Sequence, residues 1–217
     1  MTTVSIPLGP DTIQGDLVLP ENANAAVVFA HGSGSSRHSP RNKFVAEVLN
    51  RASLATLLID LLTAEEELVD IGTAEYRFNI ALLADRLIAA TDWCRKHSRL
   101  SNFAIGYFGA STGAAAALVA AAKRPEHVTA VVSRGGRPDL AQNDLSRVSA
   151  PTLLIVGEFD RDVIELNRTA AKAMRAPNEI RIVPGATHLF EEEGALEEVA
   201  ALAREWFEKN LIGRKVA

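Results

Sequence analysis

The sequence predicts an α/β protein in which a mostly parallel sheet is covered by helices on both faces. Short, continuous apolar runs recur along the chain, and such runs are typical of strands that are buried on both sides. Helical patterns alternate with these runs, as they do where helices connect parallel strands. Polar or glycine-rich turns follow several strands, and in such sheets the active site lies beyond the carboxyl ends of the strands.

Composition limits the classes to which the chain can belong. Its 217 residues, 47% of them hydrophobic, suit a single α/β domain over residues 1–217. A net charge of −4 gives no electrostatic reason to expect a nucleic acid or an anionic membrane as partner. Cys94 is the single cysteine, so an internal disulfide is excluded. We see neither a secretory signal nor an apolar run of the roughly 18 residues that span a bilayer, and we therefore expect a cytoplasmic protein.

The first part of the chain predicts half-exposed strands before the buried ones. Residues 12–19 alternate apolar and polar side chains, as half-exposed antiparallel strands do. The elements that we expect as far as Lys96 are strands at 3–8 and 12–19, a buried strand at 25–30, a helix at 40–51, a buried strand at 54–60, an acidic loop at 63–70, and a long amphipathic helix from about 73 to 96.

The second part of the chain predicts a regular alternation of strands and helices. The stretch 102–123 begins as a buried strand, turns sharply, and continues as an alanine-rich helix that Pro125 closes. The elements that we expect after it are a strand at 127–133, a small helix within the next residues, a strand at 151–157, a helix at about 162–174, a strand at 179–183 and a terminal helix at about 195–210.

The turn Gly109-Ala110-Ser111-Thr112-Gly113 is the motif most specific for catalysis. It places a serine between two glycines, at a point where a strand passes into a helix, which is the pattern of a nucleophile elbow. Side chains at the two glycine positions would clash with neighbouring chain in so sharp a turn. The helix that follows directs free N–H groups toward the serine, where they favour developing negative charge.

Three other polar positions follow predicted strands and should therefore meet Ser111 at one edge of the sheet. They are Asp160, His188 and the loop 31–36. A serine hydroxyl is a weak nucleophile and needs an adjacent base. His188 is the candidate base, and Asp160 is the candidate that would hold its imidazole in the correct tautomer. Asp162 and Glu158 remain alternatives for the acid.

With these residues, nearly the whole chain resembles the α/β-hydrolase superfamily, and most closely its dienelactone-hydrolase-like branch. The order Ser, acid, His matches, and the segments L-L-I-V-G-E-F-D and V-P-G-A-T-H-L-F are similar to the acid and histidine turns of that family. The resemblance implies an α/β-hydrolase fold with a sheet of about eight strands. Residues 133–151 are too few for the cap domain of other members, so we expect no cap domain and an open site.

One departure from the family concerns the nucleophile. Dienelactone hydrolases proper carry G-x-C-x-G, whereas this chain has Ser111, which favours a serine esterase over an enzyme for dienelactone itself. The backbone N–H of Thr112 should form half of the oxyanion hole, because such dipoles need no reorganisation when charge develops. By resemblance to the His-Gly-X turn of the superfamily, the other half should come from Ser33 or, as the alternative, Gly34. His31 is expected to brace that loop.

Arginines near the same edge raise the question of an anionic substrate. They are Arg37, Arg41, Arg134 and Arg137. A guanidinium group suits a carboxylate or phosphate, so one hypothesis is a substrate or leaving group that is acidic. The alternative is that these arginines pair with nearby acidic residues of the surface, namely 65–67 and Asp139.

The sequence therefore predicts a carboxylesterase-like serine hydrolase that needs no cofactor. A lactone or dienelactone hydrolase, a peptidase and an acyltransferase could use the same triad. A binding domain without catalysis is the alternative from another class. No cluster of His, Cys and carboxylate residues has the spacing of metal ligands, and no glycine pattern matches a P-loop or a dinucleotide site.

Overall fold

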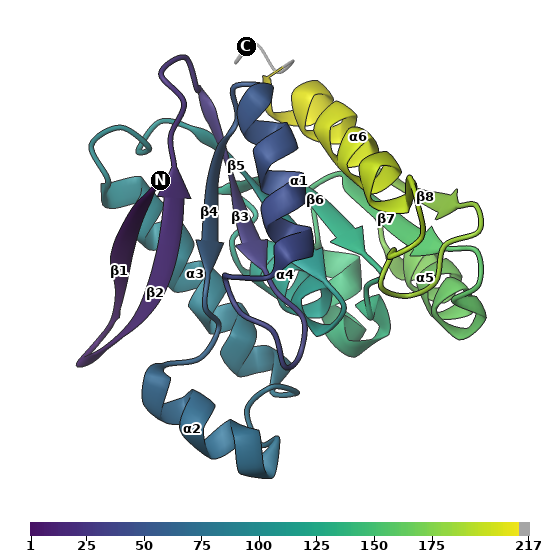
Figure 1. Cartoon of the computed structure of the whole chain (residues 1–217), viewed down its shortest axis with the longest axis horizontal. Helices are drawn as coiled ribbons and strands as arrows, with labels where there is room; N and C mark the ends of the chain where they lie inside the picture. Colours follow the sequence, from purple (N-terminus) through teal and green to yellow (C-terminus); the bar gives the residue numbers. More distant parts are fainter. Residues whose placement is uncertain (213–217) are drawn as a thin grey trace.

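Eight strands form one sheet across the molecule in the computed structural model, which describes residues 1–212 (Figure 1). The strand order is β1-β2-β4-β3-β5-β6-β7-β8. The strands are β1 (Thr2–Leu8), β2 (Asp11–Val18), β3 (Ala25–Ala30), β4 (Ala55–Ile59), β5 (Ala104–Ala110), β6 (Val128–Arg134), β7 (Thr152–Gly157) and β8 (Asn178–Val183). β1 and β2 pair antiparallel with each other, as do β2 and β4, and all other pairs are parallel.

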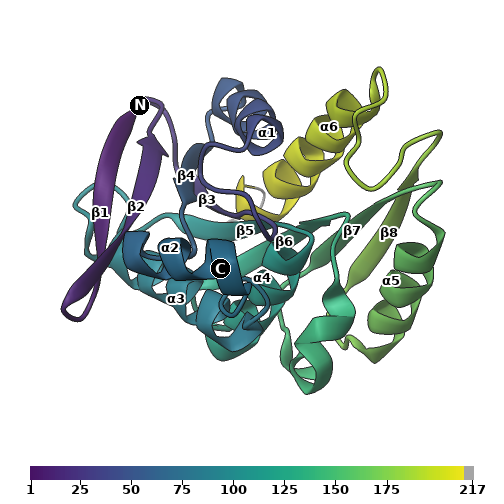
Figure 2. The same ribbon diagram turned by 60° about the horizontal axis from the view of Figure 1, so that its bottom comes forward.

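Helices cover both faces of the sheet, as the alternating pattern predicts. Figure 2 shows α1 and α6 on one face and α3, α4 and α5 on the other. The helices are α1 (Pro40–Arg51), α2 (Ala64–Thr73), α3 (Ile80–Lys96), α4 (Thr112–Lys123), α5 (Arg161–Ala173) and α6 (Ala195–Phe207), with a 3-10 helix η1 (Pro138–Arg147) and a π-helical turn η2 (Glu208–Ile212). Within residues 1–212, no helix is both long and apolar enough to cross a bilayer.

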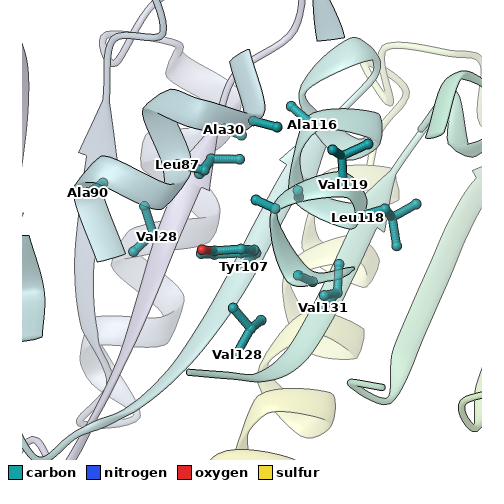
Figure 3. Packing of buried hydrophobic residues seen from close by; sticks show 14 of the residues in the cluster. Val28, Ala30, Leu87, Ala90, Tyr107, Ala116, Leu118, Val119, Val128 and Val131 are labelled. Atoms are coloured by element: carbon teal, nitrogen blue, oxygen red, sulfur yellow. The ribbon is translucent and has the colours of Figure 1, made fainter. Parts of the chain in front are cut away.

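The two faces of the sheet carry separate hydrophobic cores. The residues of α1 and α6 pack with Phe29 and Phe108, and those of α3 and α4 pack with Val28 and Tyr107. Figure 3 shows Tyr107 among buried side chains that include Val28, Leu87 and Val131. The Tyr107 hydroxyl is buried but bonds the Thr91 hydroxyl at 2.5 Å, which satisfies a polar group that would otherwise be costly to bury.

Two expectations about the chain between β4 and β5 are wrong. The acidic stretch 63–70 is not a loop, because most of it belongs to α2, and the long helix begins at Ile80 instead of near Thr73. Thr63 and Glu66 form a reciprocal capping box that starts α2 and supplies partners for its first N–H groups. The Asn79 side chain accepts from Leu82 N–H and so starts α3 separately.

The absence of a cap domain between β6 and β7 is confirmed. Those strands are joined only by a loop and by η1, which lies against α4 and α5. The loops that follow β3, β6, β7 and β8, together with the turn between β5 and α4, hold most of the candidate site.

Candidate active site

Ser111 occupies a strained turn between β5 and α4. Its backbone torsions are φ 50° and ψ −119°, a conformation that is rare for a residue with a side chain. A Cβ at Gly109 would lie 2.4 Å from Ala114 Cα, and a Cβ at Gly113 would lie 2.3 Å from the carbonyl oxygen of His31. The close approach of α4 to β5 and β3 therefore requires glycine at both positions, as the elbow pattern predicts.

His188 is hydrogen bonded to Asp160. The distance between His188 Nδ1 and Asp160 Oδ2 is 2.6 Å. Asp160 follows β7 and its side chain is 15% exposed, whereas His188 lies in the loop after β8 and its side chain is 39% exposed. Of the alternative acids, Glu158 accepts from Gly185 N–H, and Asp162 is exposed in the first turn of α5 with no bond to His188. The geometry thus brings Asp160 to the histidine.

Ser111 and His188 line one cavity of about 230 Å³. Ser33, Arg41 and Arg134 line the same cavity. No hydrogen bond joins Ser111 Oγ to His188 in the described chain, and such bonds are often long before substrate binds. Among residues 1–212, no three His, Cys, Asp or Glu side chains are grouped as metal ligands would be.

The loop after β3 lies directly on the nucleophile turn. A Cβ at Gly32 would be 3.2 Å from Ser111 Cβ, and Ser33 Oγ lies 2.9 Å from Thr112 Oγ1. The backbone N–H groups of Ser33 and Thr112 make no hydrogen bond with any residue that the structure describes. Two unpaired N–H groups therefore sit next to Ser111. Gly34, the alternative donor, has a φ of 68° and does not line the cavity.

His31 braces this loop, as the sequence predicts. Its Nδ1 bonds Gly32 O at 2.9 Å, and its Nε2 accepts from Leu61 N–H at 3.1 Å. Burial lowers the pKa of His31, which favours the neutral imidazole that can make both bonds at once.

The four arginines fall into two groups. Arg37 pairs with Asp60 and Asp16, and Arg137 makes two hydrogen bonds to Asp139 at 2.8 and 2.9 Å. Neither of these arginines lines the cavity that holds Ser111. Both arginines therefore pair with acidic residues, which is the alternative to binding an anionic substrate. The partners of Arg37 are Asp60 and Asp16, however, and not residues 65–67.

Arg41 and Arg134 line the cavity itself. Arg41 bonds Glu191 at 3.0 Å, whereas Arg134 is 7% exposed and makes no ion pair with residues 1–212. The sequence had no signal that separates these two from Arg37 and Arg137, because all four lie near strand ends.

A clasp formed by Asp70 and Arg77 supports the loop after β3, and sequence reasoning missed it. Asp70 is 2% exposed and accepts hydrogen bonds from the backbone N–H groups of Tyr76 and Arg77 and from Arg77 Nε. Burial alone would raise the pKa of Asp70, but these bonds outweigh it and lower that pKa. The Arg77 carbonyl in turn accepts from Ser33 Oγ. Asp70 lies in α2, and the sequence signal that could have predicted this helix is the Thr63–Glu66 capping box.

Comparison with known proteins shows the family and the fold of the chain. The model of the dienelactone hydrolase family matches residues 67–211. This chain belongs to the dienelactone hydrolase family. A crystal structure of a dienelactone hydrolase from Anabaena variabilis is 57% identical, with a TM-score of 0.95 over 97% of both chains. Est1E from Butyrivibrio proteoclasticus shares the fold at 17% identity, with a TM-score of 0.81 over 98% of this chain and 99% of that one.

Curated relatives of this family member are longer proteins. Two from Mycobacterium tuberculosis, each named "Putative phosphoribosyl transferase", are 55% identical over 210 residues. That match covers 97% of this chain but only 46% of theirs, so the chain spans about half of their length. The family and the fold are those of hydrolytic enzymes of the α/β-hydrolase type.

Proposed function

We propose that this family member is a serine hydrolase that cleaves carboxylic esters through an acyl-enzyme. The observation that carries the proposal is the 2.6 Å bond between His188 and Asp160 at the cavity that Ser111 lines. The strained turn at Ser111 supports the proposal because it is a recognised way to present a nucleophile.

In the acylation step, Ser111 Oγ attacks the carbonyl carbon of the ester while His188 Nε2 takes the hydroxyl proton. The carbonyl oxygen becomes an oxyanion, which accepts from the backbone N–H groups of Ser33 and Thr112 at the N-terminus of α4. The C–O bond to the alcohol then breaks, and the alcohol leaves with the proton that His188 returns.

In the deacylation step, water replaces the alcohol. His188 takes a proton from water, and the resulting hydroxide attacks the acyl carbon on Ser111. The carboxylic acid leaves, and His188 returns the proton to Ser111 Oγ. Asp160 holds Nδ1–H of the ring through both steps and stabilises the imidazolium that forms transiently.

Lactone hydrolysis is the second candidate, because the protein from Anabaena variabilis at 57% identity is named a dienelactone hydrolase. The same steps would open a lactone, with the acid and the alcohol then in one product. Rates on an aryl acetate, on dihydrocoumarin and on an amino-acid anilide separate esterase, lactonase and peptidase activities. Phosphoribosyl transfer is not part of the proposed function, because the name phosphoribosyl transferase belongs to longer proteins of which this chain spans 46%.

Ser111 is expected to give a burst with 4-nitrophenyl acetate. One equivalent of nitrophenol per active site should appear before the steady state, and a serine-directed phosphonate should label Ser111. Ser111→Ala should show neither the burst nor the label. Turnover that survives Ser111→Ala would contradict the acyl-enzyme route. No burst, no turnover and no label in the unaltered protein would favour the non-catalytic binding domain.

Asp70→Ala is expected to lower kcat about tenfold to a hundredfold with little change in KM, because it releases Arg77 and with it the Ser33 loop. Asp85→Ala is the matched control, since Asp85 pairs with Lys123 on the exposed side of α3. A merely structural role for Asp70 would lower Tm and leave kcat, measured well below Tm, unchanged.

A further inference from the structure

The segment 134–137, called here the β6 loop, holds the backbone of Ser111 by both of its polar groups. The carbonyl of Arg134 accepts from Ser111 N–H, and Arg137 N–H donates to the carbonyl of Ser111, each bond being 3.2 Å long. A displacement of this loop would therefore also displace the nucleophile turn.

The β6 loop also lies against the ring of His188. A Cβ at Gly135 would be 3.1 Å from His188 O and 3.5 Å from His188 Cε1, the ring atom that is bonded to both nitrogens. Gly135 has a φ of 51°, and its N–H donates to Ile155 O in β7 at 2.8 Å. Because one loop contacts both Ser111 and His188, its position influences the distance over which the proton must pass from Oγ to Nε2.

Asn167 connects the β6 loop to α5. Its side chain is 0% exposed, and its amide nitrogen donates to Gly136 O at 3.0 Å and to Val163 O at 2.8 Å. Gly136 is buried, and its carbonyl accepts no other hydrogen bond from residues 1–212. Without Asn167 this buried carbonyl would have no partner, and such groups are costly enough to make a loop shift.

Packing alone does not explain an asparagine at this place. Asn167 Oδ1 is buried without a hydrogen bond to the described residues, and so is Ser133 Oγ. A Cβ at Gly136 would overlap Ser133 Oγ, so Ser133 lies directly against the same loop. Buried polar atoms without partners destabilise the folded protein. The bond from the amide nitrogen to the β6 loop is the contribution that an apolar side chain could not make.

The helix that carries Asn167 also carries the acid. Asp160 is the N-cap residue of α5, and Asn167 lies about two turns further along this helix. One rigid element thus holds Asp160 against His188 and holds the β6 loop through Gly136. We propose that Asn167 is a positioning residue that sets the approach of His188 to Ser111, an inference that rests on the proposed serine hydrolase function.

Asn167→Ala is expected to lower both the rate constant of the burst with 4-nitrophenyl acetate and kcat, each about tenfold to a hundredfold. Acylation and deacylation both use His188, so the two rate constants should fall together and KM should hardly change. Asn178→Ala is the matched control, because the Asn178 amide also donates to two backbone carbonyls, but near the far end of α5. It should lower Tm as well, yet leave both rate constants within about twofold.

Asn167→Leu covers the case in which a cavity at this position prevents Asn167→Ala from folding. Leucine has as many side-chain heavy atoms as asparagine but no hydrogen-bond donor, so it should lower the same two rate constants. Unchanged rate constants in a folded variant at position 167, or an equal fall in Asn178→Ala, would overturn the proposal.

A spectroscopic measurement separates failure of this proposal from failure of the esterase proposal. The proton between His188 Nδ1 and Asp160 should give a downfield NMR resonance, which His188→Ala identifies by removing it. We expect Asn167→Ala to shift or broaden this resonance, because the ring is no longer held by Gly135, and Asn178→Ala to leave it unchanged. No ester is needed for this measurement. A shifted resonance in a protein that turns over no ester would support the role of Asn167 and contradict only the choice of substrate, whereas an unchanged resonance would overturn that role.

Discussion

Asp160→Asn is expected to lower kcat for ester hydrolysis by about 10⁴-fold. The carboxylate accepts from His188 Nδ1 at 2.6 Å and so leaves Nε2 free to take the proton of Ser111. An asparagine amide can donate to Nδ1 and thereby stabilise the opposite tautomer, in which Nε2 already carries a proton. The volume of the side chain hardly changes, so the loss reports on proton transfer and not on packing. Steady-state rates with 4-nitrophenyl acetate, measured across the pH range, give the result.

Asp162→Asn is the matched control for this substitution. It lies two residues further along the chain, exposed in the first turn of α5, and makes no bond to His188. We expect its kcat to stay within about twofold of the unaltered protein, as is usual for surface changes. A loss in Asp162→Asn as large as that in Asp160→Asn would contradict the assignment of Asp160 as the acid.

The sequence was most informative where one geometric rule applies to the whole sheet. Residues that follow parallel strands meet at one edge, so the proximity of Ser111, His188 and Asp160 could be predicted from their positions after β5, β8 and β7. The distance from Asp160 to His188 is set by contacts between loops far apart in the chain. That is why Asp162 and Glu158 could be ranked below Asp160 but could not be excluded before the structure.

The role of a residue could not be predicted from the sequence where that role depends on which distant residue it pairs with. Arg37 and Arg134 both lie near strand ends, yet Arg37 meets two carboxylates and Arg134 meets an aromatic ring. No local pattern encodes that difference, because Asp16 lies in β2 and Asp60 directly follows β4, both far from Arg37 in the chain. The clasp of Asp70 was missed for a related reason. Its role depends on α2, which was expected to be a loop, and on the break at 74–79, which lies within the helix expected from about 73 to 96.

Gly113→Ala is expected to destabilise the protein by about 3 kcal/mol or more. The new methyl group would lie 2.3 Å from His31 O and 2.5 Å from Ala30 O. Both oxygens belong to backbone at the end of β3, a strand between two neighbours in the sheet, and cannot move aside as a flexible side chain could. In a helix, alanine is more favourable than glycine by about 1 kcal/mol. The protein is destabilised only if the clash costs more than this. Denaturant unfolding, followed by circular dichroism, measures the difference.

Gly72→Ala separates the effect of the clash from the effect of helix propensity. Gly72 lies in α2, and a Cβ at this position would meet nothing within 4 Å. The same substitution should therefore stabilise the protein by about 0.5–1 kcal/mol. If the free energy of unfolding falls in Gly113→Ala and rises in Gly72→Ala, the loss at Gly113 is due to the contact between α4 and the end of β3. In a Gly113→Ala protein that folds, the added methyl group would push the His31 loop away from α4 and so move Ser33 N–H away from Ser111. Such a protein should therefore also lose turnover. A Gly113→Ala protein of normal stability would mean that α4 can retreat from β3, and the nucleophile turn would then not depend on this contact.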